Sequence, residues 1–297
     1  MPQADERPSQ NRSTKPLIAM SFGDLTRINT NVAAIGSLAQ MQRTNSELGI
    51  RQFRLATGSR LNRAEDDSAG YTIVKKLEAK LRGQSQALAN IGDAKSMLTV
   101  AEGGLNSVMD ILHTMKAKAV QAANDTMGTD ERTAIGNELT ALASEVDDII
   151  NNSEFNSNQL LDGTGGTGGA FQFHVGAEAA ETFTTNAIDA SALVGLTFDV
   201  STAANATAEI TNVDGYVDSV SSLLSNIGDD QKRLSFKQEN LQTSITNYEA
   251  AKSRIADADF AKEQMEIVKL QILQQTGLAS LAQANAGPQS VLSLIGG

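Results

Sequence analysis

The chain contains no cysteine and no tryptophan, and aromatic residues make up only 4% of it. The absence of cysteine excludes disulfides, thiolate metal sites and cysteine nucleophiles. His113 and His174 are the only histidines, too few for most zinc sites, and no H-E-x-x-H pattern occurs. We therefore expect no metal site and no cofactor. A scarcity of large aromatic side chains suits thin helical rods better than a thick-cored enzyme.

The sequence also lacks a basic excess and a long apolar run. Its formal net charge is −11, and no basic face with interleaved aromatics is present, so we expect no nucleic-acid partner. No apolar stretch approaches the ~20 residues that span a bilayer, so no membrane insertion is expected. Residues 1–19 lack the apolar region of roughly 7–15 residues that a cleaved secretory signal requires. We interpret 1–19 as a disordered extension, or Met20 as the true start.

The strongest pattern that is present is a strict seven-residue repeat near the end of the chain. Its positions are all large and apolar: Val213, Val220, Ile227, Leu234, Leu241, Tyr248 and Ile255. A straight helix drifts off such a repeat, so only helices wound around a partner helix keep the stripe buried. The repeat therefore predicts one long rod-forming helix over residues 213–255.

A second repeat supplies a partner for that helix. Its main row is Leu77, Gln84, Ile91, Leu98, Leu105 and Leu112. A companion row is interrupted by Lys95 and Glu102, and polar core positions cost stability but can fix register. A third helix is expected over about 130–150. The predicted fold is mainly α, a long antiparallel coiled-coil or helical-bundle rod formed by residues 64–162 and 213–255. Its expected core is Leu77, Ile91, Leu98, Leu105, Val220, Ile227, Leu234 and Leu241.

Amphipathic helices are predicted at both ends of the chain, over residues 20–63 and 256–297. The first carries six arginines against two acidic residues, and the second carries four acidic residues against two lysines. We expect them to pair into a discontinuous inner domain, since helical stability comes mostly from packing an apolar face. Exposed apolar arms favour association with other copies. The expected self-assembly residues are Leu25, Ile28, Val32, Ile35, Ile267, Leu270, Leu273 and Leu281.

The middle of the chain, residues 163–212, has a different composition. The glycine-rich segment 163–169 is a flexible break, and Phe171, Phe173 and Val175 then alternate with polar residues, as do residues 196–200. Period-two alternation bounded by glycine predicts short strands, so a small insertion containing a β-hairpin is expected here. The segment spells G-x-G-x-x-G, but the dinucleotide fingerprint requires a strand before it and a helix within it.

No catalytic constellation can be assembled from the sequence. Acidic pairs such as Asp66-Asp67 and Asp229-Asp230 are adjacent on predicted helices, where neighbouring side chains do not face one another. A solvated face explains them better than acid–base chemistry. We therefore expect that the protein is not an enzyme, and an active site within residues 163–212 is the remotest alternative.

Several motifs near both ends of the chain resemble bacterial flagellins. The N-terminal ones include Arg27-Ile-Asn-Thr-Asn-Val32, Arg54-Leu-Ala-Thr-Gly-Ser-Arg-Leu-Asn62 and Ala64-Glu-Asp-Asp-Ser-Ala-Gly70. The C-terminal ones include Gln271-Ile-Leu-Gln-Gln275 and Leu281-Ala-Gln-Ala-Asn285. The resemblance covers roughly residues 20–162 and 213–297, in order.

This resemblance implies a secreted structural subunit that polymerises into the extracellular flagellar filament for swimming motility. It also implies export through the flagellar type III apparatus. The implied partners are other copies of the chain, the flagellar cap and hook-associated proteins, and an export chaperone with the export gate. The nearest alternative is the hook–filament junction protein of the same family. A secreted tip or coiled-coil adaptor of a related injection system is a further alternative.

The sequence departs from the family at one place. Flagellins sensed by the vertebrate innate immune receptor carry an Arg and, three residues later, a Glu before their Ala-Val-Gln segment. The matching positions here are Thr114 and Ala117. The resemblance therefore implies weak activation of that receptor.

Overall fold

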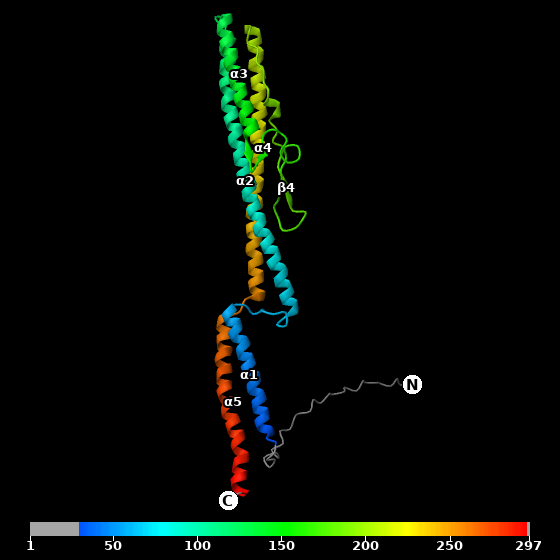
Figure 1. Ribbon diagram of the computed structural model, residues 1–297, viewed down its shortest axis with the longest axis vertical. Helices are drawn as coiled ribbons and strands as arrows, with labels where there is room; N and C mark the ends of the chain where they lie inside the picture. The colour runs from blue at the N-terminus through cyan, green and yellow to red at the C-terminus, as the bar shows by residue number, and fades with distance from the viewer. Residues whose placement is uncertain (1–29, 296–297) are drawn as a thin grey trace, which may run out of the picture. The chain divides into compact units, whose positions relative to one another are not determined.

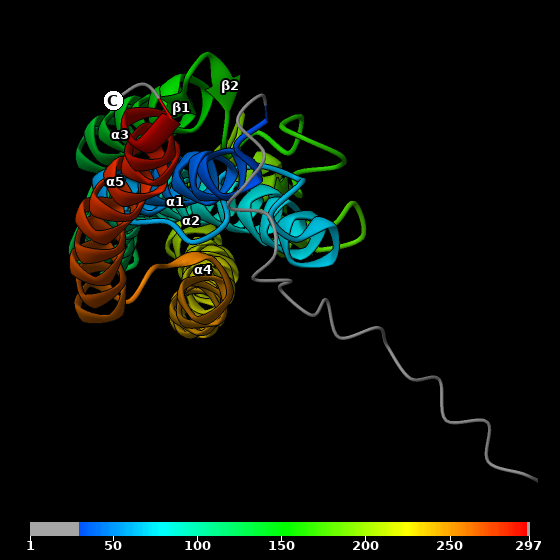
Figure 2. The ribbon, with the colours of Figure 1, turned by 90° about the horizontal axis from the view of Figure 1, so that it is seen from below.

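The computed structural model describes residues 30–295, with side chains up to residue 286. The chain forms two compact units, Met1–Asn62 with Asp257–Gly297, and Arg63–Ala256. The first unit contains helices α1 (Val32–Thr57) and α5 (Phe260–Ile295), which lie side by side (Figures 1 and 2). The second contains the remaining elements.

Three helices form the larger unit: α2 (Ser68–Ala122), α3 (Thr129–Asn152) and α4 (Ala203–Ala256). We call these three helices the rod. Helix α2 packs along α4 over most of its length, and α3 packs against the C-terminal half of α2 (Figure 1). The fold is mainly α, as the heptad rows predict, with two small antiparallel strand pairs. One pair lies in the alternating segment that predicts a hairpin, whereas the pair within residues 154–159 was not predicted.

The rod core follows the two seven-residue rows. Seven of the eight expected core residues are buried: Ile91, Leu98, Leu105, Val220, Ile227, Leu234 and Leu241. The eighth, Leu77, is only half-buried. It lies near the N-terminal end of α2, beyond the stretch that α3 covers.

In the middle of the rod, polar residues interrupt this core at two neighbouring levels, where they form hydrogen bonds between the two long helices. Gln231 Nε2 donates to Glu102 Oε2 at 2.9 Å. About two turns away along the helices, Lys95 Nζ donates to Gln238 Oε1 at 3.3 Å and to Ser235 Oγ at 3.2 Å. We call these five residues the polar layer. Lys95 and Glu102 of α2 thus each have a partner on α4, which favours one register between the two helices.

The segment between α3 and α4, residues 153–202, holds the strands, and we call it the insertion. Strands β1 (Glu154–Phe155) and β2 (Asn158–Gln159) form one antiparallel pair. Strands β3 (Gln172–His174) and β4 (Thr182–Thr184) form another, with Phe173 opposite Phe183. A single 3₁₀ turn, η1 (Ser191–Leu193), follows.

The expectation of a strand over residues 196–200 is wrong. That segment is irregular, with Val200 buried and the side chains of Leu196 and Phe198 half-buried against the core. Val200 Cγ2 lies 3.4 Å from where a Cβ on Gly136 of α3 would stand. The alternating apolar side chains of this segment therefore pack on the rod, and the segment does not pair with another strand.

Helix α4 begins ten residues before the predicted start at residue 213, at Ala203. The Thr202 hydroxyl accepts a hydrogen bond from the Asn205 backbone N–H at 3.1 Å. A threonine that accepts from the first helical turn is an N-cap, and it satisfies a donor that would otherwise lack a partner.

One buried carboxylate anchors the insertion to α4. Asp230 is 1% exposed. It accepts hydrogen bonds from the Asn186 backbone N–H at 2.6 Å and from Asn186 Nδ2 at 3.2 Å. Arg233 donates to the same carboxylate at 2.9 Å, and its guanidinium lies 4.7 Å from the centre of the Phe183 ring. The β3–β4 hairpin is therefore held against α4 by a fully satisfied polar cluster.

Candidate assembly site

The first unit is an antiparallel pair of helices, α1 and α5, which we call the terminal pair. Helix α1 begins after Asn31, whose side chain accepts from the Ala34 N–H at 3.0 Å, and it ends at Gly58 in the left-handed region, with φ of 68°. A left-handed glycine is a common helix terminator because it has no Cβ to clash. The chain thus stops α1 by local chemistry before the second unit begins.

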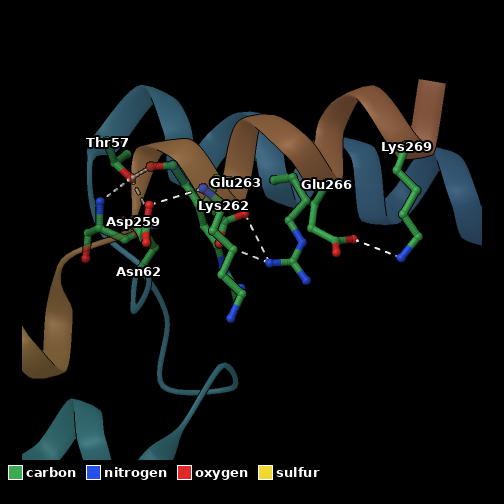
Figure 3. Close-up of polar contacts among 10 residues, drawn as sticks. Thr57, Asn62, Asp259, Lys262, Glu263, Glu266 and Lys269 are labelled. Carbon is green, nitrogen blue, oxygen red and sulfur yellow. Dashed lines mark hydrogen bonds and ion pairs between the residues drawn. The ribbon is translucent and has the colours of Figure 1, made fainter. Parts of the chain in front are cut away.

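Helix α5 begins beside the end of α1. The Ala258 N–H donates to the Gly58 carbonyl at 2.9 Å, and Asp259 Oδ1 accepts from the Lys262 N–H at 3.1 Å as the N-cap of α5. Figure 3 shows Asp259 and Lys262 beside Thr57 and Asn62. Asn62 Nδ2 donates a hydrogen bond to Thr57 Oγ1 at 3.0 Å. The end of α1 and the start of α5 are therefore held together directly.

Polar contacts fix the register of the terminal pair along its length. Arg51 Nη1 lies 3.0 Å from both carboxylate oxygens of Glu263, and the Glu263 side chain is only 7% exposed. Farther along, Gln274 Nε2 donates to Asn45 Oδ1 at 2.7 Å, and Asn31 Nδ2 donates to the Ala284 carbonyl at 2.7 Å. The opposite charges of the two helices thus meet in a largely buried ion pair.

Few apolar side chains are covered inside this pair. In the described part of the unit, the large buried apolar residues are Leu61, Ile267 and Leu270. Many others stay exposed on both helices: Val32, Ile35, Leu38, Ile50, Phe53, Phe260, Met265, Val268, Ile272, Leu273 and Leu278. Two paired helices cannot cover this many apolar side chains, so the terminal pair presents an exposed apolar surface.

The expected self-assembly residues fall into two groups. Ile267 and Leu270 are buried between α1 and α5, whereas Val32, Ile35 and Leu273 are 55%, 58% and 46% exposed. Leu281 is half-buried. Leu25 and Ile28 lie outside the described residues.

Several exposed members of the apolar surface were not predicted from the sequence. Met265 is 67% exposed, Ile272 58% and Phe53 49%. Phe53 follows the arginine that pairs with Glu263 by two positions, so it points to a different side of α1. The signal that could have found these residues is their excess: each helix carries more apolar residues than one partner can cover.

The two positions at which the sequence departs from receptor-sensed flagellins lie on an exposed face of α2. Both Thr114 and Ala117 are exposed. The neighbouring lysines are engaged, Lys116 with Asp214 of α4 at 2.5 Å and Lys118 with Glu138 of α3 at 2.8 Å. The charges near this segment are thus already paired within the rod.

Within residues 30–295, no cluster of histidine and acidic side chains could hold a metal ion. In the same part of the chain, no helix is long and apolar enough to cross a membrane.

Comparison with known proteins identifies the family to which the chain belongs. Residues 28–165 match the family model of the bacterial flagellin N-terminal helical region, and residues 210–295 match that of the C-terminal helical region. A flagellin of Halalkalibacterium halodurans is 36% identical over 272 residues, which cover 90% of this chain and 99% of the relative. A flagellin of Bacillus subtilis is 36% identical over 304 residues, covering 91% and 99%.

A solved structure of a putative flagellar hook-associated protein from Vibrio parahaemolyticus is also similar. Its TM-score is 0.54 at 15% identity, and the match covers 65% of this chain and 100% of that chain. Identity this low shows a shared fold alone. The two family matches at both ends and the full-length relatives show that this chain belongs to the bacterial flagellin family.

Proposed function

We propose that the chain is a structural subunit of the bacterial flagellar filament and that the terminal pair is its polymerisation element. The observation that carries this proposal is the apolar surface on both α1 and α5, left uncovered although the two helices are already paired. Burying one such side chain is worth about 1.5–3 kcal/mol, so several copies packed together gain a large driving force.

The filament subunit is favoured over the hook–filament junction protein. Relatives named flagellin match this chain over 99% of their own length at 36% identity. The hook-associated structure matches at 15% identity, which supports only the common fold. We propose in addition that the chain is exported through the flagellar type III apparatus, with a chaperone and the export gate, and assembles outside the cell beneath the cap.

The flagellin family is a family of structural proteins, and we propose no catalytic role. The contacts of the buried Asp230 and the half-buried Glu102 support this, since both carboxylates accept hydrogen bonds from other segments of the chain. Carboxylates that accept such hydrogen bonds stabilise the fold and do not line an open cleft as a catalytic group would.

A charge placed on the apolar surface tests the polymerisation role. Ile35 is 58% exposed in the single chain, so Ile35→Asp is expected to leave the rod folded. In a polymer the new carboxylate is buried without a partner, which costs several kcal/mol. Seeded polymerisation followed by light scattering and electron microscopy should show no elongation.

The matched control is Asn106→Asp, which adds the same charge at an exposed position of α2. It should elongate as the unaltered chain does. Leu270→Asp is expected to stop elongation too, but Leu270 is buried within the terminal pair, so this variant also separates α1 from α5. Normal filaments from Ile35→Asp would overturn the proposed role of this surface.

A further inference from the structure

A groove of about 490 Å³ lies between the β3–β4 hairpin and α4, within the second unit. Its size falls in the range of small-molecule sites, ~300–1,000 Å³. Gln84 of α2 lines it, with Glu181 and Thr182 on the hairpin side and Phe236 and Asn240 on α4. The polymerisation proposed above does not use it.

The hairpin side of the groove is fixed in place. Asn90 Nδ2 of α2 donates to the His174 carbonyl at 3.0 Å. The Glu178 N–H donates to Glu181 Oε2 at 3.0 Å, which orients that carboxylate. The hairpin turn also rests on Gly83, where an added Cβ would lie 2.9 Å from Ala177 Cβ and 3.3 Å from Ala177 Cα. The groove is therefore formed before anything enters it.

A residue that lines the groove carries a buried acceptor without a partner. Gln84 is 5% exposed, and its Oε1 has no hydrogen-bond partner among the described residues. A buried polar atom left without a partner costs about 1–3 kcal/mol. A ligand that donates a hydrogen bond to this oxygen would recover that cost.

The walls indicate which donor fits. Phe236, which is 62% exposed, forms an apolar aromatic wall. The hydrogen-bonding groups of the lining come from Glu181, Thr182, Asn240 and Ser244. Lys237 balances the charge of Glu181, so the lining carries no net charge. Ordinary small-molecule sites are mostly apolar, and this polar lining with one aromatic ring suits a ligand that is both hydroxyl-rich and apolar on one face.

We propose that this groove binds a neutral saccharide. A sugar hydroxyl donates to Gln84 Oε1, neighbouring hydroxyls bond Glu181 and Asn240, and the C–H face of the pyranose ring packs on Phe236. An anion is disfavoured by the Glu181 carboxylate, and a cation by Lys237. A purely apolar ligand would leave the Gln84 oxygen without a partner.

Saturation-transfer difference NMR on the full chain tests this, with methyl glycosides of glucose, galactose, mannose and N-acetylglucosamine as probes. At least one probe should receive saturation, and its dissociation constant can then be measured by titration. Gln84→Leu keeps the apolar row of α2 and removes the acceptor, and it should weaken binding about tenfold. Phe236→Ala should weaken the same sugar and remove transfer to its ring C–H protons.

A pair of glycine substitutions separates the groove from general effects on the rod. Gly83→Ala introduces a Cβ that displaces the hairpin turn, whereas a Cβ on Gly103 meets nothing within 4 Å. Gly83→Ala should abolish binding, and Gly103→Ala should leave it unchanged. The proposal is overturned if no probe receives saturation, which would mean that water alone occupies the groove, or if Gln84→Leu binds as tightly as the unaltered chain.

Discussion

Asp230 shows how much of the fold can depend on a single side chain. Its carboxylate is buried and accepts three hydrogen bonds, two from Asn186 and one from Arg233. Asp230→Ala leaves the Asn186 N–H without its acceptor, so we expect the free energy of unfolding to fall by about 2–4 kcal/mol. Urea denaturation followed by circular dichroism measures the loss.

The adjacent residue is a natural control. Asp229 is exposed, so Asp229→Ala removes the same charge from the same helix and should change the free energy of unfolding by less than about 0.5 kcal/mol. Equal losses for the two variants would show that net charge on α4, and not the anchor to the insertion, governs stability here.

Thr114 and Ala117 carry a prediction about recognition by the innate immune receptor. Both side chains are exposed on α2, and neither bears a charge. Loss of a charged hot spot from an interface typically costs ~2–5 kcal/mol. Purified monomer should therefore stimulate receptor-bearing reporter cells weakly. The double variant Thr114→Arg with Ala117→Glu should increase the response, and strong stimulation by the unaltered chain would contradict this account.

At the scale of the elements, we expect the Glu102 and Gln231 side chains of the polar layer to be energetically coupled across α2 and α4. Gln231→Leu alone leaves Glu102 in a half-buried site without its 2.9 Å donor, so we expect it to destabilise the rod by about 1–3 kcal/mol. Glu102→Leu with Gln231→Leu removes both polar groups, and the double variant should recover most of that loss. A double-mutant cycle of unfolding free energies measures the coupling; additive effects would show that the pair does not interact.

The long helices were largely predictable, because a seven-residue repeat constrains both the type of element and the face that is buried. Ile91, Leu98 and Leu234 are fully buried where the repeat predicts a core. The start of α4 was missed, although the Thr202 cap was visible as a threonine before a run of helix-forming alanines. The expected strand at residues 196–200 failed because alternation also arises when a single segment packs one side against helices.

The terminal pair was harder to resolve from sequence. Opposite charge predicted that the two helices pair, and Arg51 does bond Glu263. The amphipathic pattern could not say which apolar residues face the partner helix and which face outward. That choice depends on the rotation of each helix about its own axis, which is why Leu270 is buried whereas Leu273 is exposed.

For the whole molecule, the two units should differ in resistance to proteolysis before assembly. In the described part of the first unit, only Leu61, Ile267 and Leu270 are large buried apolar residues, whereas the rod has a continuous core. Regions with few buried contacts open most readily. Brief trypsin treatment of monomer should therefore cut α1 and α5 first and leave a fragment close to residues 63–256, identified by mass spectrometry. First cuts within α2 or α4 would contradict this expectation.

The most direct test of the account is cryo-electron microscopy of the full chain after seeding with filament fragments. We predict long regular tubes in which Val32, Ile35, Met265 and Ile272, all exposed in the single chain, are covered by α1 and α5 of other copies. Persistent monomers or short rings, or tubes in which these four side chains remain open to solvent, would contradict the central claim that the terminal pair builds the filament.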